Sequence, residues 1–195
     1  MKQYLLMALW AILFAGASAQ TWVSGSLSFY NTSHDLESQG SSQSIISQKS
    51  LSTSLSPTVG YDVNERWALG VSLAFNYALS EGKSDNVEMF NNRSNMIYLS
   101  PFVRCYLAET EGLRFFVDGG VGFGRRHYFE RDENDNVFKA YVTPGLSYAI
   151  NPHFSLLGNF GGFSWIQSRS NGQANEKQWS FTLFDQISLG LLFKL

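Results

Sequence analysis

The sequence predicts an all-β fold, an eight-stranded antiparallel up-and-down transmembrane β-barrel, and three observations support this prediction. About eight segments alternate bulky apolar residues with small or polar ones, the period of a strand with two unlike faces. Short connections alternate with long polar connections along the chain. Only 15% of the residues are charged, against roughly 25% in ordinary soluble domains, while 15% are aromatic.

The amino terminus is predicted to be a cleaved secretory signal peptide over residues 1–19. A basic start at Lys2 precedes an apolar core that ends at about Phe14, and the small residues Ala17 to Ala19 form a cleavage site. The apolar core is well short of the ~20 residues that a spanning helix needs. We therefore expect residues 20–195 to form one outer-membrane β-barrel domain.

The clearest of the first four predicted strands is Trp67–Leu79, "WALGVSLAFNYAL", in which every bulky residue occupies an odd position. The even positions hold only Ala, Gly, Ser and Asn, whereas a soluble sheet shows strongly hydrated side chains on its second face. Small residues suit the inside of a narrow barrel and a row of large apolar residues suits lipid. The other three are Val23–Phe29, Leu51–Val63 and Met96–Ala108.

The remaining strands continue this alternation to the end of the chain. The glycine-rich fifth strand sets Phe115, Val117 and Phe123 against Asp118 and several glycines. In the seventh, glycines fall on both faces and weaken the pattern. The four predicted strands are Leu113–Tyr128, Val137–Ile150, Phe154–Ile166 and Trp179–Phe193.

The connections indicate which end of the barrel faces which compartment. The short ones, each predicted as a three-residue turn, are Asn64–Arg66, Thr110–Gly112 and Asn151–His153. The long polar ones are Thr32–Ser50, Ser80–Arg93, Glu130–Asn136 and Ser168–Lys177. Bacterial outer-membrane barrels have short periplasmic turns and long extracellular loops. The sequence thus predicts that the protein lies in the outer membrane of a Gram-negative bacterium, with its long loops extracellular and both termini periplasmic.

Residues 20–195 resemble the small outer-membrane β-barrel superfamily, of the OmpA transmembrane domain, OmpX and opacity-protein type. The resemblance rests on "FFVDGGVGFG" at Phe115–Gly124, "VTPGLSYAINPHFSL" at Val142–Leu156 and the terminal "FDQISLGLLFKL". It implies insertion by the barrel-assembly machinery. In the family the last residue is often Phe, whereas here Leu195 is last and Phe193 stands two residues before it.

Charged residues on the inward faces are the candidate functional residues of the lumen. A three-residue Thr110–Gly112 turn would place Leu113 opposite Glu109, and Arg104 opposite Asp118. Because an isolated buried charge is costly, we expect these two to pair. Asp62 and Arg114 share the inward face nearer the periplasmic end. This interior charge network is either a plug that holds the barrel shape, the preferred interpretation, or part of a narrow conduction path.

On the outer surface, Arg125 and His127 are predicted to face lipopolysaccharide head groups, with ordinary interfacial anchoring as the alternative. The net charge of -2 argues against nucleic-acid binding, and no motif indicates a metal or cofactor. Some eight-stranded barrels modify lipid A with a Ser–His pair. Here the histidines are predicted in a loop (His34), at a strand end (His127) and in a short turn (His153), so no such pair is expected on one face of a strand and we expect no enzyme.

The predicted function is that of an integral outer-membrane protein with a structural or surface-interaction role in the cell envelope. The first alternative is a narrow porin-like channel for small solutes, and the second is a lipid A-modifying enzyme. The expected partners are outer-membrane lipid, lipopolysaccharide and the barrel-assembly machinery, and the barrel is expected to be a monomer.

Overall fold

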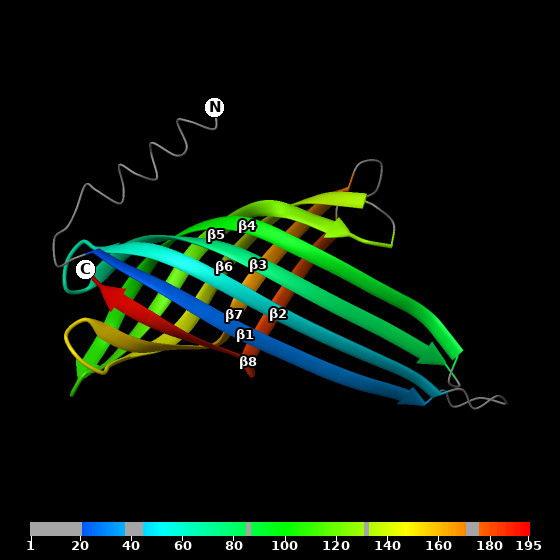
Figure 1. The fold of residues 1–195 in the computed structure, drawn as a ribbon, viewed down its shortest axis with the longest axis horizontal. Helices are drawn as coiled ribbons and strands as arrows, with labels where there is room; N and C mark the ends of the chain where they lie inside the picture. Colours follow the sequence, from blue (N-terminus) through cyan, green and yellow to red (C-terminus); the bar gives the residue numbers. More distant parts are fainter. Residues whose placement is uncertain (1–20, 38–44, 85–86, 131–132, 171–175) are drawn as a thin grey trace.

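The computed structural model describes residues 21–37, 45–84, 87–130, 133–170 and 176–195, which form a closed antiparallel barrel (Figure 1). Each strand pairs with its neighbours in the chain and β1 pairs with β8, so the predicted eight-stranded up-and-down order is confirmed. The predicted signal peptide lies outside the described residues. The strands are β1 (Thr21–Glu37), β2 (Ile45–Asp62), β3 (Trp67–Ser84), β4 (Val87–Thr110), β5 (Leu113–Tyr128), β6 (Glu133–Ala149), β7 (Phe154–Ser170) and β8 (Glu176–Lys194).

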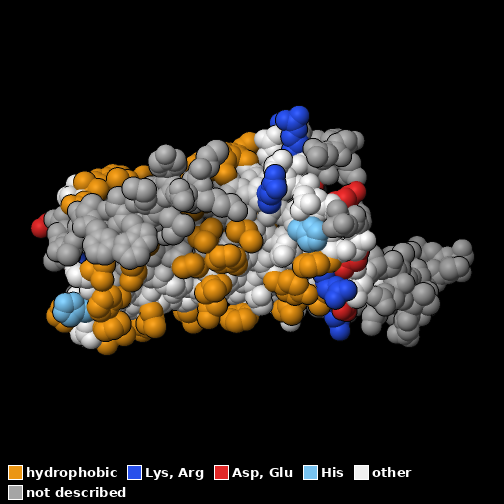
Figure 2. Space-filling model, turned by 45° about the horizontal axis from the view of Figure 1, so that its top comes forward, with side chains coloured by type: hydrophobic (Ala, Val, Ile, Leu, Met, Phe, Trp, Pro, Cys, Tyr) orange, Lys and Arg blue, Asp and Glu red, His pale blue; other side chains and the backbone are white. Residues whose placement is uncertain are grey.

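The outer wall of the barrel is an apolar band. In β3 the side chains of Leu69 and Leu73 are 51% and 37% exposed, whereas Ala68 and Ala74, on the other face, are 0% and 3% exposed. The parity predicted for this strand is therefore correct. Figure 2 shows the same arrangement over a whole face, with hydrophobic side chains in the middle and charged side chains and histidines toward the two ends. Within the described ranges, no helix has the length and apolarity to span a bilayer.

Two of the three short connections keep the predicted three-residue turn, because Val63 N donates to Trp67 O and Ile150 N donates to Phe154 O just outside it, and each turn is closed by an asparagine. Asn64 Oδ1 accepts the backbone amides of Arg66 and Trp67, each at 2.9 Å. Asn151 Oδ1 accepts the amides of His153 and Phe154 at the same distances. An Asx turn of this kind replaces backbone hydrogen bonds inside the tight connection. We call the end of the barrel that carries the short connections the turn end, and the opposite end the hairpin end.

The third short connection differs from its prediction. It has two residues, Glu111 and Gly112, with φ of 44° and 83°, as a two-residue hairpin turn requires. Glu109 therefore pairs with Arg114, and the predicted pairing of Glu109 with Leu113 was wrong. A register shift between Tyr106 and Ala108 then removes the offset of one residue. Arg104 consequently faces Asp118 as predicted, although the turn that led to this prediction was one residue too long.

The four predicted long loops are largely strand. β1 continues to Glu37 and β2 begins at Ile45, while β3 and β4 are separated only by residues 85–86 and β5 and β6 only by 131–132. The ladder of backbone hydrogen bonds needs no apolar side chains, so polar hairpins extend beyond the apolar band. A tilted strand crosses a membrane in about 9–11 residues, and these strands have 16–24. Apolar alternation marked only the part suited to lipid.

The barrel is closed by a short seam between β1 and β8. Their register runs from Trp22↔Lys194 to Phe29↔Ile187, although β1 continues to Glu37. In β8, residues 183–186 lie opposite Gly161 alone, and the β7–β8 register shifts there. In the part of the chain that is described, the two closing strands are therefore paired only in the half nearer the turn end, and they separate toward the hairpin end (Figure 1).

Candidate functional site

The lumen is blocked near the turn end by a cluster of large apolar side chains that we call the plug. Trp22 is 0%, Phe116 1% and Phe102 7% exposed. Strands β1, β3, β4, β5, β7 and β8 all contribute a residue, so the plug spans the barrel from wall to wall. Its members are Trp22, Ala68, Phe102, Phe116, Leu157 and Leu192. The sequence predicted a small or polar lumen, and in this half of the barrel that expectation was wrong.

Each large ring of the plug lies over a glycine of the neighbouring strand. Trp22 pairs in register with Gly60, and Phe116 pairs with Gly145. Phe102 lies between two glycines, Gly70 of β3 and Gly120 of β5. A Cβ atom on Gly60, Gly70 or Gly145 would collide with the facing ring. The absent side chains thus leave room for the rings directly over the glycine backbone.

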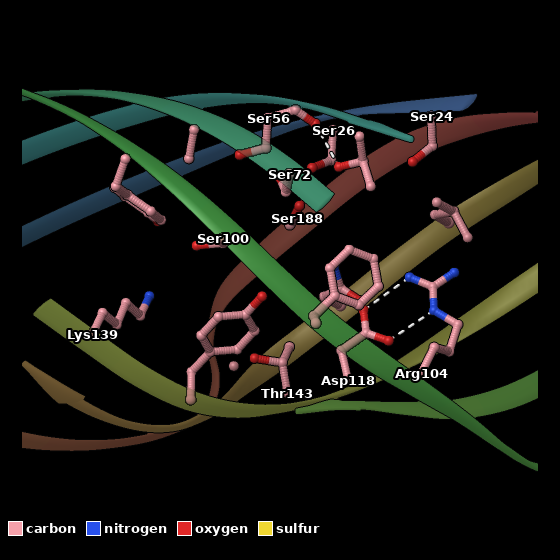
Figure 3. Close-up of a pocket in the computed structure, with 18 residues that line it drawn as sticks. Ser24, Ser26, Ser56, Ser72, Ser100, Arg104, Asp118, Lys139, Thr143 and Ser188 are labelled. Carbon is pink, nitrogen blue, oxygen red and sulfur yellow. Dashed lines mark hydrogen bonds and ion pairs between the residues drawn. The ribbon is translucent and has the colours of Figure 1, made fainter. Parts of the chain in front are cut away.

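The Arg104–Asp118 pair sits against this plug. Arg104 Nε donates to Asp118 Oδ1 at 2.7 Å and Nη2 donates to Oδ2 at 2.8 Å, a bidentate geometry (Figure 3). Arg104 is 4% and Asp118 8% exposed. The guanidinium carbon lies 3.8 Å from the centre of the Phe116 ring and 5.1 Å from that of Trp22. The pair is therefore enclosed by aromatic rings and contributes to the block.

Asp62 and Arg114, the other two predicted members of the interior network, lie closer to the turn end and belong to different contacts. The Asp62 carboxylate accepts Trp22 Nε1 at 2.9 Å and the Tyr106 hydroxyl at 3.2 Å, and Lys194 Nζ lies 3.6 Å from it. It thereby ties β2 to β1, β4 and β8. Arg114 instead pairs with the exposed Glu109 at 2.7 Å.

The sequence reasoning missed Lys194 and Tyr106, which complete the Asp62 cluster. Both positions share the inward parity of their strands, so parity could have found them. The inward aromatic residues Trp22, Phe102 and Phe116 have the same signal, together with the glycine opposite each. That second signal becomes readable only when the strand register is known.

On the hairpin side of the plug the lumen holds a polar cavity of about 190 Å³. Serine and threonine hydroxyls from several strands line it, among them Ser24, Ser56, Ser72, Thr143 and Ser188 (Figure 3). Lys139 also lines it, with Nζ 5.8 Å and 5.3 Å from the rings of Tyr98 and Tyr141. Arg104 and Asp118 are among its lining residues, next to the plug. Phe102 and Leu157 of the plug also line the cavity, which therefore ends at the plug on its turn-end side.

At the hairpin end, Arg125 is exposed on the outer wall, and His127 is half-buried. His127 Nδ1 lies 3.3 Å from Asn134 Oδ1, and its ring contacts Phe129. Nearby, Glu130 accepts the backbone amide of Arg93 at 2.8 Å, and this hydrogen bond lowers the pKa of the Glu130 carboxyl. His153 lies at the turn end, far from His127. Among the residues the structure covers, no group of three or more His, Cys, Asp or Glu side chains could hold a metal ion.

Comparison with known proteins identifies the same architecture. The model of the family described as "Outer membrane protein beta-barrel domain" matches residues 5–192. The structure of Neisserial surface protein A superposes with a TM-score of 0.52 at 16% identity, covering 92% of this chain and 99% of that one. The outer membrane protein OprG from Pseudomonas aeruginosa gives a TM-score of 0.52 at 14% identity, covering 92% and 98%. These two likenesses concern the fold alone. No curated protein matches the sequence.

Proposed function

We propose that this chain, which belongs to the outer membrane protein β-barrel domain family, is an occluded, non-conducting barrel with a structural or surface-interaction role in the envelope. It acts as a monomer and catalyses no reaction. The narrow porin-like channel is the alternative, and the polar cavity beside Lys139 is the observation that favours it. A lipid A-modifying activity would change the mass of lipid A on expression, and we expect no change.

In this proposal the turn end faces the periplasm and the hairpin end faces outward. The start of β1 and the end of β8 meet at the turn end, where Leu195 N donates to Thr21 O at 3.0 Å. A signal peptide cleaved after Ala19 leaves Gln20 on the periplasmic side, consistent with this orientation. Mass spectrometry of the exported protein should find Gln20 as the first residue. The barrel-assembly machinery is the partner expected during insertion.

The plug is the single observation that carries the non-conducting role. The rings of Trp22 and Phe116 are buried completely or nearly so, and the Arg104–Asp118 pair is packed against them. A water-filled pore would leave such side chains wet. Moving a ring out of the lumen would also empty the space over its glycine, which costs packing contacts. The closed state is therefore expected to persist in the membrane.

Planar-bilayer recording tests this proposal. The wild-type barrel should give no stepwise current, whereas Trp22→Ala/Phe116→Ala, which removes two rings of the plug, should conduct. Phe75→Ala removes a ring from the lipid-facing wall and should remain silent. Folding of each variant is checked by the mobility difference between heated and unheated samples on a gel. Regular current steps from the wild-type protein would instead establish the channel.

A further inference from the structure

Three basic residues lie together on the outer wall near the hairpin end, and we call them the cation row. They are Arg125 of β5, Arg169 of β7 and Lys177 of β8, all exposed. Arg125 pairs in register with Asn136 and Asn136 with Arg169, so two arginines flank one amide side chain. Lys177 pairs with Gln167, two residues from Arg169, which makes it the diagonal neighbour of Arg169.

An aromatic shelf lies directly beside the cation row on its turn-end side. The rings follow one another across β5, β6, β7 and β8, with centroids 5.0, 5.6 and 5.9 Å apart, in the order Phe123, Phe138, Trp165, Trp179. Phe123 and Trp179 stand two residues from Arg125 and Lys177, about 7 Å along the strand. The wall therefore presents cations above and a continuous apolar surface below.

Among the side chains that the structure describes, no carboxylate forms an ion pair with a residue of the cation row. Glu130 is paired with Arg93, and Asp135 is on the inward face and 8% exposed. The ion pairs found in these ranges involve Arg93, Arg104, Arg114 and Lys194, and no residue of the cation row. Basic side chains are visible at this end of the molecule beyond the hydrophobic band (Figure 2). An anionic group that approaches the row therefore displaces none of these ion pairs.

We infer that this wall binds one phosphorylated glycolipid of the outer leaflet, with its phosphates on the cation row and its acyl chains on the aromatic shelf. The inference rests on the proposed function, because that function places the hairpin end in the outer leaflet. Arginine forks match phosphate oxygens in a bidentate manner, and Asn136 and Gln167 can hydrogen-bond sugar hydroxyls.

The geometry also selects the class of lipid. From β5 to β8 the row crosses three strand spacings, about 14 Å. A disaccharide head group with a phosphate at each end spans such a row, whereas the single phosphate of a glycerophospholipid meets only one or two of its cations. The occupant is therefore a bisphosphorylated, acylated disaccharide of the lipid A type. Arg125, which the sequence pointed to, forms one end of the site, while His127, beside Asn134, lies outside it.

Native mass spectrometry of the folded barrel in detergent tests this inference, with bisphosphorylated lipid A, dephosphorylated lipid A and phosphatidylglycerol as probes. The wild-type barrel should retain one bisphosphorylated lipid A. Arg125→Gln/Arg169→Gln/Lys177→Gln should weaken retention at least tenfold, and Arg125→Gln or Arg169→Gln alone about threefold. Arg66→Gln is the matched control, since it removes an exposed arginine at the turn end and should change nothing.

The outcomes separate this inference from the function on which it rests. Equal retention by the triple variant and the wild type, equal loss in Arg66→Gln, or equal retention of phosphatidylglycerol would each overturn the glycolipid site. If the triple variant fails the gel test of folding, the two single variants decide. Binding in detergent requires neither an orientation nor a closed lumen. If the wild-type barrel conducts ions and retains lipid A, only the proposed function is refuted. If it conducts no ions and does not retain lipid A, only the glycolipid site is refuted.

Discussion

Breaking the Arg104–Asp118 pair should destabilise the barrel asymmetrically. Arg104→Met leaves the Asp118 carboxylate buried without its cation, which typically costs about 3–5 kcal/mol. Asp118→Asn leaves the guanidinium in place over the Phe116 ring, at 3.8 Å, and near Trp22. Desolvated cation–π contacts contribute about 2 kcal/mol, so this variant should lose only about 1–3 kcal/mol. Arg104→Met should thus be the more damaging single change.

The double variant Arg104→Met/Asp118→Asn should be no less stable than Arg104→Met alone. Its unpaired buried charge is gone, and the Met side chain retains most of the packing against the rings. The two charges attract each other by about 4 kcal/mol at an effective dielectric constant of 20, so the departure from additivity should be large. The measurement is the free energy of unfolding in urea, in lipid vesicles, from tryptophan fluorescence and gel mobility.

The Glu109–Arg114 pair supplies the internal control, because it joins the same two strands at 2.7 Å but is exposed. Glu109→Gln and Arg114→Met should each cost about 1 kcal/mol or less, with little coupling. Strict additivity at Arg104 and Asp118 would refute the reasoning, since it would mean that the charges do not interact. A larger loss in Asp118→Asn than in Arg104→Met would refute the role of the rings.

Three further predictions concern the wall, the plug and the hairpin end. Leu73→Arg, on the lipid face, should reduce the free energy of unfolding by about 2–4 kcal/mol, while Ser72→Thr, which faces the lumen cavity, should have a mild effect. Both are measured by urea unfolding in lipid, and a larger loss in Ser72→Thr than in Leu73→Arg would contradict the assigned faces. Gly60→Ala should cost about 1–3 kcal/mol by overpacking against Trp22, whereas Gly25→Ala meets no atom within 4 Å and should be near neutral, so equal losses would speak against the ring-over-glycine packing. The hydrogen bond that lowers the pKa of Glu130 stabilises the folded hairpin at pH values above the ordinary carboxyl pKa, and this stabilisation is lost as the pH falls through the lowered value. The protection of the Arg93 amide from hydrogen exchange should therefore drop in acid. If the same drop persists in Glu130→Gln, Glu130 is not its cause.

The fold could be predicted from the sequence because lipid imposes a simple rule on each strand. The alternation in Trp67–Leu79 marked both faces of β3 correctly, and the asparagine turns at Asn64 and Asn151 have the predicted length. The hairpin ends could not be predicted in this way. Polar residues such as those between Thr32 and Glu37 continue the β1 ladder without any hydrophobic pattern. The periodicity of a strand shows which of its faces contacts lipid, but it does not show where the strand ends.

The candidate site was only partly accessible for a related reason. Arg104 and Asp118 could be placed opposite each other because a buried charge requires a partner, and the bulge near Leu107 happened to compensate the turn length. The sequence did not reveal that Trp22, Phe102 and Phe116 point inward, since bulky residues are expected to face lipid. Their parity could be read from the sequence, but only the register places a glycine opposite each ring. The cation row likewise depends on pairing across four strands.

The pairing of each ring with a glycine also constrains how this lumen can change during evolution. Position 60 cannot gain a side chain while position 22 holds tryptophan, but it becomes free once that residue is small. Substitutions at the two positions must therefore occur in a fixed order, with the ring shortened first. Among related barrels we expect residue sizes at facing positions to vary inversely, 22 with 60 and 116 with 145. An open lumen would then arise by successive losses of rings, each followed by relaxed selection on its glycine.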